Sequence, residues 1–390
     1  MATPPPGLNP RAVIEGRPPG KRRPGPMVGI AVGTLCALLA AGADLVQSLA
    51  GSRPGVAPFL AAVTLALLPV PMLVAVVLLI DRLEPEPRSY LAFTFAWGAG
   101  IAALLAAVIN TAGLVYITQP DLGQTTGQYI SATFGAPVVE ETLKGAALGW
   151  LLWRRRQEFD AATDGIVYAA MVGLGFAMTE NIGYYINALV RPEVGGAQLL
   201  GVTFVFRGLL APFAHPVFTS MTGLGAAYAA THRRAGWAFA AGLAGAMILH
   251  GLWNGLTALG LRGVAVAYVL VICVMGVLAW LVVRDRRAII GLIWRFLPAY
   301  QPAGVVTEPD LRMLSTLRGR RAARRRARAA GGGAAARAMT DYQLAATELA
   351  LAHQRAERGL LTGRQFAIRQ RDLLRLMAAE QLRLQGGNLA

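Results

Sequence analysis

Three charged side chains lie one helical turn apart within an apolar stretch of this sequence. They are Glu140, Glu141 and Lys144, in the segment PVVEETLKGAALGW. In a membrane-spanning helix, a charge at the bilayer centre costs about 2.5–3.5 kcal/mol even on lenient insertion scales. Ionisable residues within a membrane therefore pair with one another or mark a functional site.

Further polar residues lie in the apolar segments that follow. Glu180 lies in GFAMTENIGYY, His215 in APFAHPVF, and His250 with Asn254 in HGLWNGL. His250 and Asn254 are four residues apart and so share one face of a helix. At about 1.5 Å per residue, the segments bring these carboxylates and imidazoles to a similar depth, near the midplane or somewhat toward the outer face.

Two imidazoles and several carboxylates at one depth offer the ligand types that zinc prefers, which usually leave one position for water. A bound metal lowers the pKa of that water toward about 7, and a spare glutamate can take its proton. The set therefore predicts hydrolysis of a peptide bond within the membrane, with a divalent metal and zinc as the expected one.

The composition indicates an all-α polytopic membrane protein. Of 390 residues, 55% are hydrophobic and 15% are charged, whereas about a quarter are charged in soluble domains. The apolar residues form runs of about 20 or more, enough to cross roughly 30 Å of hydrocarbon. We expect about eight spans, at residues 27–49, 56–80, 89–117, 129–153, 164–190, 203–231, 235–260 and 263–283.

Basic residues gather on alternate loops, before the first span and after each even-numbered span. This pattern predicts that both termini are cytoplasmic. We expect a disordered cytoplasmic arm at 1–26, a membrane-embedded domain at 27–285, and a basic cytoplasmic tail at 286–390.

The tail contains the run RGRRAARRRARAA and contributes to a net charge of +16. Such a run can bind nucleic acid, but a flank held against anionic lipid is the favoured interpretation, and no nucleic-acid partner is expected. Apolar residues at helical spacing then predict one or two amphipathic helices, broken near Gly363.

The motifs resemble those of the PrsW family of intramembrane proteases. EETLK, FAMTEN, His215 and HGLWN follow one another on successive spans, and DRLEPEP after the second span also fits. The resemblance covers about residues 27–285. PrsW proteins are related to the CAAX prenyl endopeptidases and the Abi proteins, which have histidine where this chain has Glu180.

The resemblance implies a catalytic set with these members: Glu140, Glu141, Glu180, His215, His250 and Asn254. His215, His250 and Glu180 would approach the metal or the water, and Asn254 would act as an oxyanion or water-orienting donor. Because adjacent helical residues point about 100° apart, Glu140 and Glu141 cannot both face one centre. Pairing of Glu140 with Lys144 slightly favours Glu141 as the general base, but both remain open.

The family resemblance also implies a membrane-anchored protein substrate, of anti-sigma-factor type in site-1 cleavage, and a bacterial cytoplasmic membrane. A proton- or ion-coupled transporter is an alternative, because buried ionisable residues also build proton relays. We see no convincing internal repeat of the kind that transporters usually have. A non-catalytic scaffold of the same superfamily is a third hypothesis.

Individual residues have structural alternatives. His215 precedes Pro216 and could bond a carbonyl freed by a proline kink, and Asn254 could serve packing between helices. Asp44, Asn110 and Arg207 are intramembrane polar residues without a motif, and no chemistry is assigned to them.

Overall fold

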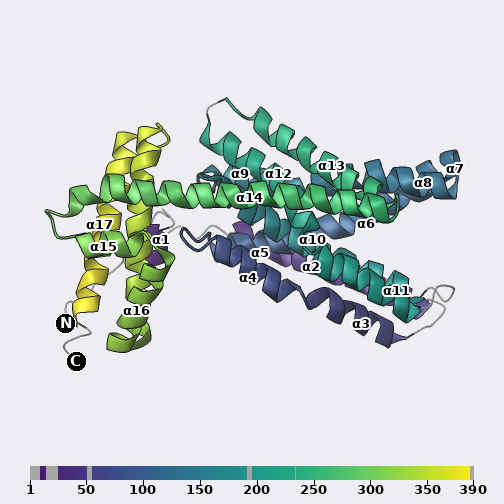
Figure 1. Ribbon diagram of the computed structural model, residues 1–390, viewed down its shortest axis with the longest axis horizontal. Helices are drawn as coiled ribbons and strands as arrows, with labels where there is room; N and C mark the ends of the chain where they lie inside the picture. The colour runs from purple at the N-terminus through teal and green to yellow at the C-terminus, as the bar shows by residue number, and fades with distance from the viewer. Residues whose placement is uncertain (1–8, 15–24, 51–54, 191–195, 233, 387–390) are drawn as a thin grey trace. The chain divides into compact units, whose positions relative to one another are not determined.

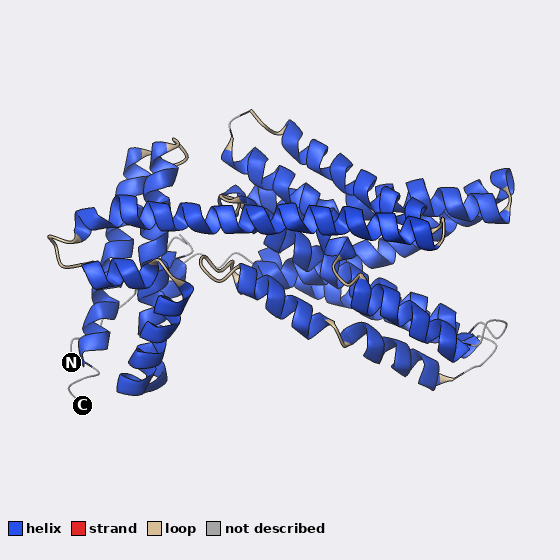
Figure 2. Cartoon of the chain, viewed as in Figure 1, coloured by secondary structure: helices blue, strands red, loops and turns tan. Residues whose placement is uncertain are grey.

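The computed structural model describes residues 9–14, 25–50, 55–190, 196–232 and 234–386. Within these residues every regular element is a helix and none is a strand (Figure 2). The all-α prediction is therefore confirmed. In the arm at 1–26, residues Pro10–Ile14 form the short helix α1, and most of the remainder lies outside the described residues.

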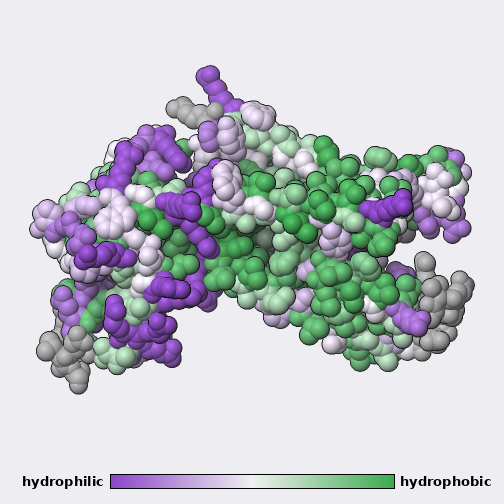
Figure 3. Space-filling model, in the orientation of Figure 1, coloured by the Kyte–Doolittle hydropathy of each residue, from purple (hydrophilic) through white to green (hydrophobic). Residues whose placement is uncertain are grey.

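The chain divides into two compact units (Figure 1). The first, which we call the membrane unit, comprises Pro24–Asp81 and Glu86–Val282. The second, the tail unit, comprises Met1–Arg23, Arg82–Pro85 and Val283–Ala390. In the view of Figure 3 the membrane helices carry a mainly hydrophobic surface, whereas hydrophilic side chains gather on the tail helices.

Seven helical segments in the described residues are long and apolar enough to cross a membrane. They are Pro26–Ala50, Val56–Ile80, Arg88–Leu122, Ala162–Val190, Gly196–Thr231, Trp237–Thr257 and Leu261–Tyr300. Each corresponds to one of the eight expected spans. The chain is therefore a polytopic α-helical membrane protein, and the cytoplasmic placement of its termini stays a prediction.

The remaining expected span, 129–153, is also helical. It consists of α8 (Gln124–Ile130), the π-helix η3 (Ser131–Gly135) and α9 (Ala136–Arg154). It is not among the seven, because three charges lie within five residues of α9. The polarity of this helix is concentrated where the candidate site lies.

Most spans consist of one or two α-helices, some with a π-helical turn. In chain order the other elements are α2 (Gly25–Ala50), α3 (Val56–Leu67), α4 (Val70–Ile80), α5 (Arg88–Ala96), η1 (Trp97–Ala102), α6 (Ala103–Gly113), η2 (Leu114–Thr118), α7 (Gln119–Leu122), η4 (Arg156–Glu158), α10 (Ala162–Val190), α11 (Gly196–Thr203), η6 (Phe204–Leu210), α12 (Ala214–Thr231), α13 (Trp237–Thr257) and α14 (Leu261–Phe296).

Helix α10 lies at the centre of the membrane unit, where it packs against α12, η1, α3 and α5. Small residues allow this close packing. A Cβ added at Gly173 would lie 2.6 Å from the backbone nitrogen of Pro216 and 2.8 Å from the carbonyl carbon of His215. The glycine therefore lets the first turn of α12 approach α10 closely.

The expected span at 203–231 is interrupted. The π-helix η6 ends at Leu210, and α12 begins only at Ala214, so the helix is broken within the span. Pro216 lies in the first turn of α12, where proline needs no backbone N–H and causes no kink. The alternative that His215 bonds a carbonyl freed by a kink is therefore not the geometry observed.

The tail unit has its own hydrophobic core, formed by the end of α14 with η7 (Leu297–Tyr300), α15 (Glu308–Leu314), α16 (Leu317–Glu357) and α17 (Gly363–Gly386). The break between the last two helices lies where the sequence predicts it.

Helix α16 bends at Gly331 and Gly332, whose backbone dihedral angles are not helical. Farther along the same helix, the carboxylate of Glu348 is buried and accepts hydrogen bonds from Arg355 and Arg369, each at 2.6 Å. This double ion pair joins α16 to α17.

Candidate active site

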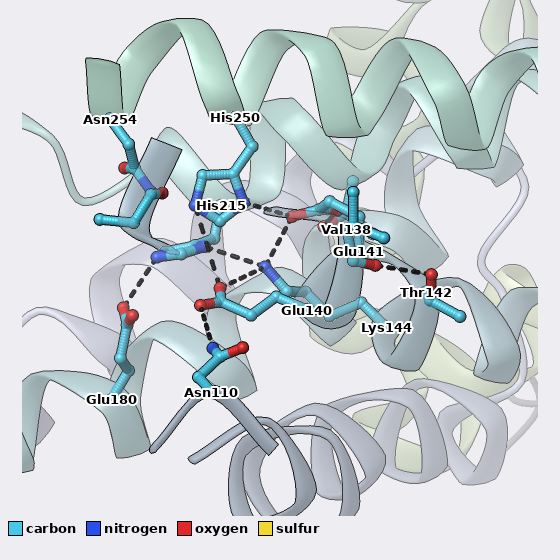
Figure 4. Close-up of polar contacts among 12 residues, drawn as sticks. Asn110, Val138, Glu140, Glu141, Thr142, Lys144, Glu180, His215, His250 and Asn254 are labelled. Carbon is cyan, nitrogen blue, oxygen red and sulfur yellow. Dashed lines mark hydrogen bonds and ion pairs between the residues drawn. The ribbon is translucent and has the colours of Figure 1, made fainter. Parts of the chain in front are cut away.

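The predicted polar residues lie together where α9, α10, α12 and α13 meet (Figure 4). Helix α9 contributes Glu140, Glu141 and Lys144, and α10 contributes Glu180. His215 comes from the first turn of α12, and His250 from the middle of α13. The convergence expected from helical depth is therefore present in the structure.

His250 is held on two sides. Its Nδ1 lies 3.0 Å from Oε1 of Glu141, and its ring stacks on Phe218 with 4.8 Å between ring centroids. Only 2% of the residue is exposed. The carboxylate fixes the Nδ1 side of the imidazole, so its Nε2 faces the centre of the site.

Glu141 uses both carboxylate oxygens. Its Oε1 accepts a hydrogen bond from Lys144 Nζ at 2.7 Å as well as contacting His250, and its Oε2 accepts one from Thr219 at 3.0 Å. The side chain is fully buried. Both oxygens of Glu141 thus have partners within the protein, so the geometry favours a positioning role for Glu141 over the slightly preferred role of general base.

Glu140 has a different environment. Its Oε1 accepts a hydrogen bond from Asn110 at 3.2 Å, but its Oε2 is buried and has no hydrogen-bond partner within the described chain. This oxygen lies 3.6 Å from Lys144 Nζ and 3.9 Å from His250 Nε2. The expected pairing with Lys144 is therefore shared, and the shorter contact belongs to Glu141 at 2.7 Å.

His215 bridges α9 and α10. Its Nε2 lies 2.9 Å from Oε2 of Glu180, and its Nδ1 lies 3.0 Å from Lys144 Nζ. Phe176, one turn before Glu180, packs against the imidazole and lies 4.0 Å from the ammonium group of Lys144. Each histidine thus has a carboxylate on one ring nitrogen, while the other nitrogen faces Glu140 and Lys144.

Glu180 is anchored by a residue to which the sequence assigned no chemistry. Arg207, in η6, donates to Oε2 of Glu180, and its Nε donates to the side-chain oxygen of Asn181 at 2.8 Å. From the sequence, Glu180 was expected to have two roles, as a catalytic residue and as a residue close to the metal. In the structure it lies behind His215 instead.

Three residues could hold a metal ion. One ligand atom from each of Glu140, His215 and His250 lies within 4.8 Å of the others. Around a tetrahedral zinc ion with bonds of about 2.1 Å, ligand atoms are roughly 3.4 Å apart, so shifts of about 1 Å would suffice. The buried Oε2 of Glu140, which accepts no hydrogen bond in the described chain, fits such an ion, and carboxylates behind both imidazoles are typical of metal-binding histidines.

Asn254 does not join this network. Its amide nitrogen donates to the backbone carbonyl of Ala132 at 2.9 Å, which ties α13 to η3. Among the described residues it has no polar contact with the carboxylates or imidazoles of the site. This geometry favours the packing alternative over the oxyanion role.

Sequence reasoning missed three residues that contact the site: Asn110, Thr219 and Arg207. Thr219 and Arg207 could have been identified from the sequence. Thr219 follows His215 by four residues on α12 and so shares its helix face, and an intramembrane arginine such as Arg207 requires a carboxylate partner. Nothing in the sequence directs Asn110 toward Glu140.

A pocket of about 250 Å³ lies next to His215. Its walls include Phe206, Trp253 and Tyr268, and Arg207 also lines it. It lies beside the break between η6 and α12, where the span is not helical. An irregular backbone at membrane depth occurs where it is enclosed by protein or lines a cavity.

These features define a polytopic membrane protein with a buried glutamate–histidine centre. The family described as "PrsW family intramembrane metalloprotease" matches residues 86–281, and the chain belongs to this family of intramembrane proteases. Protease PrsW of Geobacillus kaustophilus is 28% identical over 176 residues, which cover 45% of this chain and 69% of that protein.

A second relative, Protease PrsW of Oceanobacillus iheyensis, is 28% identical over 162 residues, or 40% of this chain and 66% of that protein. No solved structure matches the chain. The match of the family begins at Glu86 and ends within α14, so it includes all four helices of the site.

Proposed function

We propose that this chain hydrolyses a peptide bond of a membrane-anchored protein at the centre formed by Glu140, His215 and His250. The observation that carries the proposal is the buried Oε2 of Glu140, which accepts no hydrogen bond in the described chain and lies 3.6 Å from Lys144 Nζ and 3.9 Å from Nε2 of His250. A buried carboxylate oxygen without a donor is costly. A cation or a reacting water molecule at this position would satisfy it.

The residues divide into a reacting group and a supporting group. His215, His250 and Glu140 would hold a divalent ion, with zinc favoured by the ligand types; such an ion acts as a Lewis acid and lowers the pKa of water. Glu140 would bind the ion through one carboxylate oxygen, and the other, which accepts a hydrogen bond from Asn110, would accept the proton of the attacking water. Glu141 and Glu180 orient the imidazoles and fix their tautomers.

The pocket beside His215 suggests how a substrate binds. Its aromatic walls favour an apolar side chain, and Arg207 places a hydrogen-bonding group at its edge. The substrate that we propose is a membrane-anchored protein of anti-sigma-factor type, in the bacterial cytoplasmic membrane. The family resemblance supports this assignment.

The test uses the purified full-length chain in liposomes with a panel of single-span reporter proteins tagged at both ends. We expect cleavage by the wild type, one zinc ion per chain by elemental analysis, and loss of cleavage in Glu140→Gln and His250→Ala. Full cleavage by both variants would refute the proposal. Proton-coupled flux without cleavage would favour the transporter instead.

A further inference from the structure

A second pocket, of about 570 Å³, lies within the tail unit. Six arginines line it: Arg82, Arg321, Arg324, Arg325, Arg328 and Arg337. The other described residues that line it are glycine, alanine and threonine, so among the described residues neither a carboxylate nor an aromatic ring lines the pocket. A hollow with only positive charges on its walls is suited to an anion.

The helix geometry explains how the arginines come together. Arg321, Arg324 and Arg328 are spaced by three and four residues on α16, so they share one face. The bend at Gly331 and Gly332 then brings Arg337, from the second half of the helix, to the same pocket. The interrupted helix thus folds the arginine run into a concave site.

The arginines of the pocket have little opposing charge close to them in the described part of the chain. None of the six forms an ion pair within the described part of the chain, and the buried Nε of Arg321 has no hydrogen-bond acceptor. Burial lowers the pKa of Arg324, and the charges of Arg82 and Arg321 lower it further. Burial and the charge of Arg324 also lower the pKa of Arg320 to about 10. Like charges are therefore held close together, and Asp341 is an acidic group that interacts with one of them, Arg337.

We propose that this arginine pocket binds the phosphate of an anionic phospholipid headgroup. Guanidinium groups bind phosphate oxygens in pairs, with both charge and geometry matched. Inorganic phosphate shares this chemistry, but the position of Arg82 favours the lipid. Arg82 follows Ile80, the end of a membrane span, by two residues, so the chain holds it within about 8 Å of that end.

Nucleic acid is a poorer fit. Proteins that bind single strands combine basic grooves with aromatic platforms for the bases, and the pocket has no aromatic lining residue. An anionic leaflet, by contrast, attracts arginines close to a membrane span. The proposal does not depend on protease activity, so its failure and that of the proposed function can be told apart.

The experiment counts lipids on the delipidated full-length chain in neutral detergent by native mass spectrometry. Phosphatidylglycerol and phosphatidylcholine are titrated in parallel. The test variant replaces the exposed arginines of the pocket by glutamine, at Arg325, Arg328 and Arg337. The control removes the same charge elsewhere in the tail unit, at the exposed residues Arg358, Arg364 and Arg375.

We expect the wild type to bind its first phosphatidylglycerol more tightly than phosphatidylcholine. The test variant should weaken that first binding at least about tenfold, while the control stays within about twofold. Equal weakening in both variants would show that only net charge matters and would overturn the proposal.

Two competitors identify the source of the phosphate. Inorganic phosphate should displace phosphatidylglycerol more effectively than chloride at the same ionic strength. If the pocket variant lost binding of inorganic phosphate or of a 12-nucleotide RNA, but bound phosphatidylglycerol like the control, the lipid assignment would be wrong.

Discussion

Of the two adjacent glutamates, Glu140 should matter more for activity and Glu141 more for the stability of the fold. Glu140→Gln removes the carboxylate that we place in contact with the reacting water. Loss of a general acid–base group reduces rates by about 10²–10⁴-fold, or roughly 2.7–5.4 kcal/mol in activation free energy. Glu141→Gln removes a group behind His250, and loss of such supporting partners costs about 10–100-fold.

For the stability of the fold, Glu141→Gln should have a larger effect than Glu140→Gln. Glu141 forms the 2.7 Å contact with Lys144, and both side chains are fully buried. Breaking a buried ion pair by removing one partner costs about 3–5 kcal/mol, because the other charge remains without compensation. Glu140 contacts the same ammonium group at 3.6 Å, and one of its oxygens accepts no hydrogen bond. Its replacement should therefore destabilise the protein less.

The assay combines reporter cleavage per folded molecule with thermal unfolding of the purified variants in detergent. Glu357→Gln, at an exposed position of the tail unit, is the control and should match the wild type in both measurements. If Glu141→Gln were the less active variant after correction for folded protein, while Glu140→Gln kept most of its activity, the roles would have to be exchanged.

Three further predictions follow from other parts of the molecule. Gly173→Ala should lower cleavage and cost about 1–3 kcal/mol in unfolding free energy, because the added methyl group meets backbone of α12; Gly276→Ala, whose Cβ would meet nothing within 4 Å, is the matched control in thermal unfolding. Chelation of divalent metal should abolish reporter cleavage and zinc should restore it; cleavage that persists in a chain shown to be metal-free would contradict the ligand set.

The third concerns Glu348: burial raises the pKa of its carboxyl, but its two arginine partners outweigh burial and hold the pKa below its usual value. Its contribution to stability is thus present above the unfolded pKa of about 4.3 and is lost as pH falls through the folded pKa. Glu348→Gln should lower the unfolding temperature at pH 7 more than at pH 3.5, whereas Asp372→Asn, in an exposed pair, should change little at either pH.

The sequence predicts the membrane spans well because the hydrophobicity of about twenty successive residues adds up over each span. Twenty apolar residues in a row are unambiguous, and small errors at the ends do not matter. The depth argument also succeeds for the site, because the rise per residue of a helix is nearly constant. Helical depth predicts that Glu141 and His250 lie at one level, and in the structure Oε1 of Glu141 lies 3.0 Å from Nδ1 of His250.

Orientation around a helix axis is harder to predict than depth. Glu140 and Glu141 differ by about 100°, and either could face the centre until the neighbours of α9 are known. The spacing to Lys144 favoured one pairing, but a lysine side chain is long enough to reach both carboxylates. The break between η6 and α12 was not predicted either. The residues around it are apolar, so hydropathy indicates a continuous span although the helix is interrupted there.

The charges of the site are consistent with the cation that we propose, independently of the ligand distances. The centre and its support hold three carboxylates, on Glu140, Glu141 and Glu180, and two basic side chains, on Lys144 and Arg207. With charged acidic and basic groups and neutral imidazoles the formal sum is −1, because Glu140 shares the ammonium group of Lys144 with Glu141. A divalent ion changes the sum to +1, which stabilises the negative charge that develops on a peptide carbonyl oxygen during attack by water. The same ion would thus give Oε2 of Glu140 a further partner in the resting protein and favour the transition state of hydrolysis.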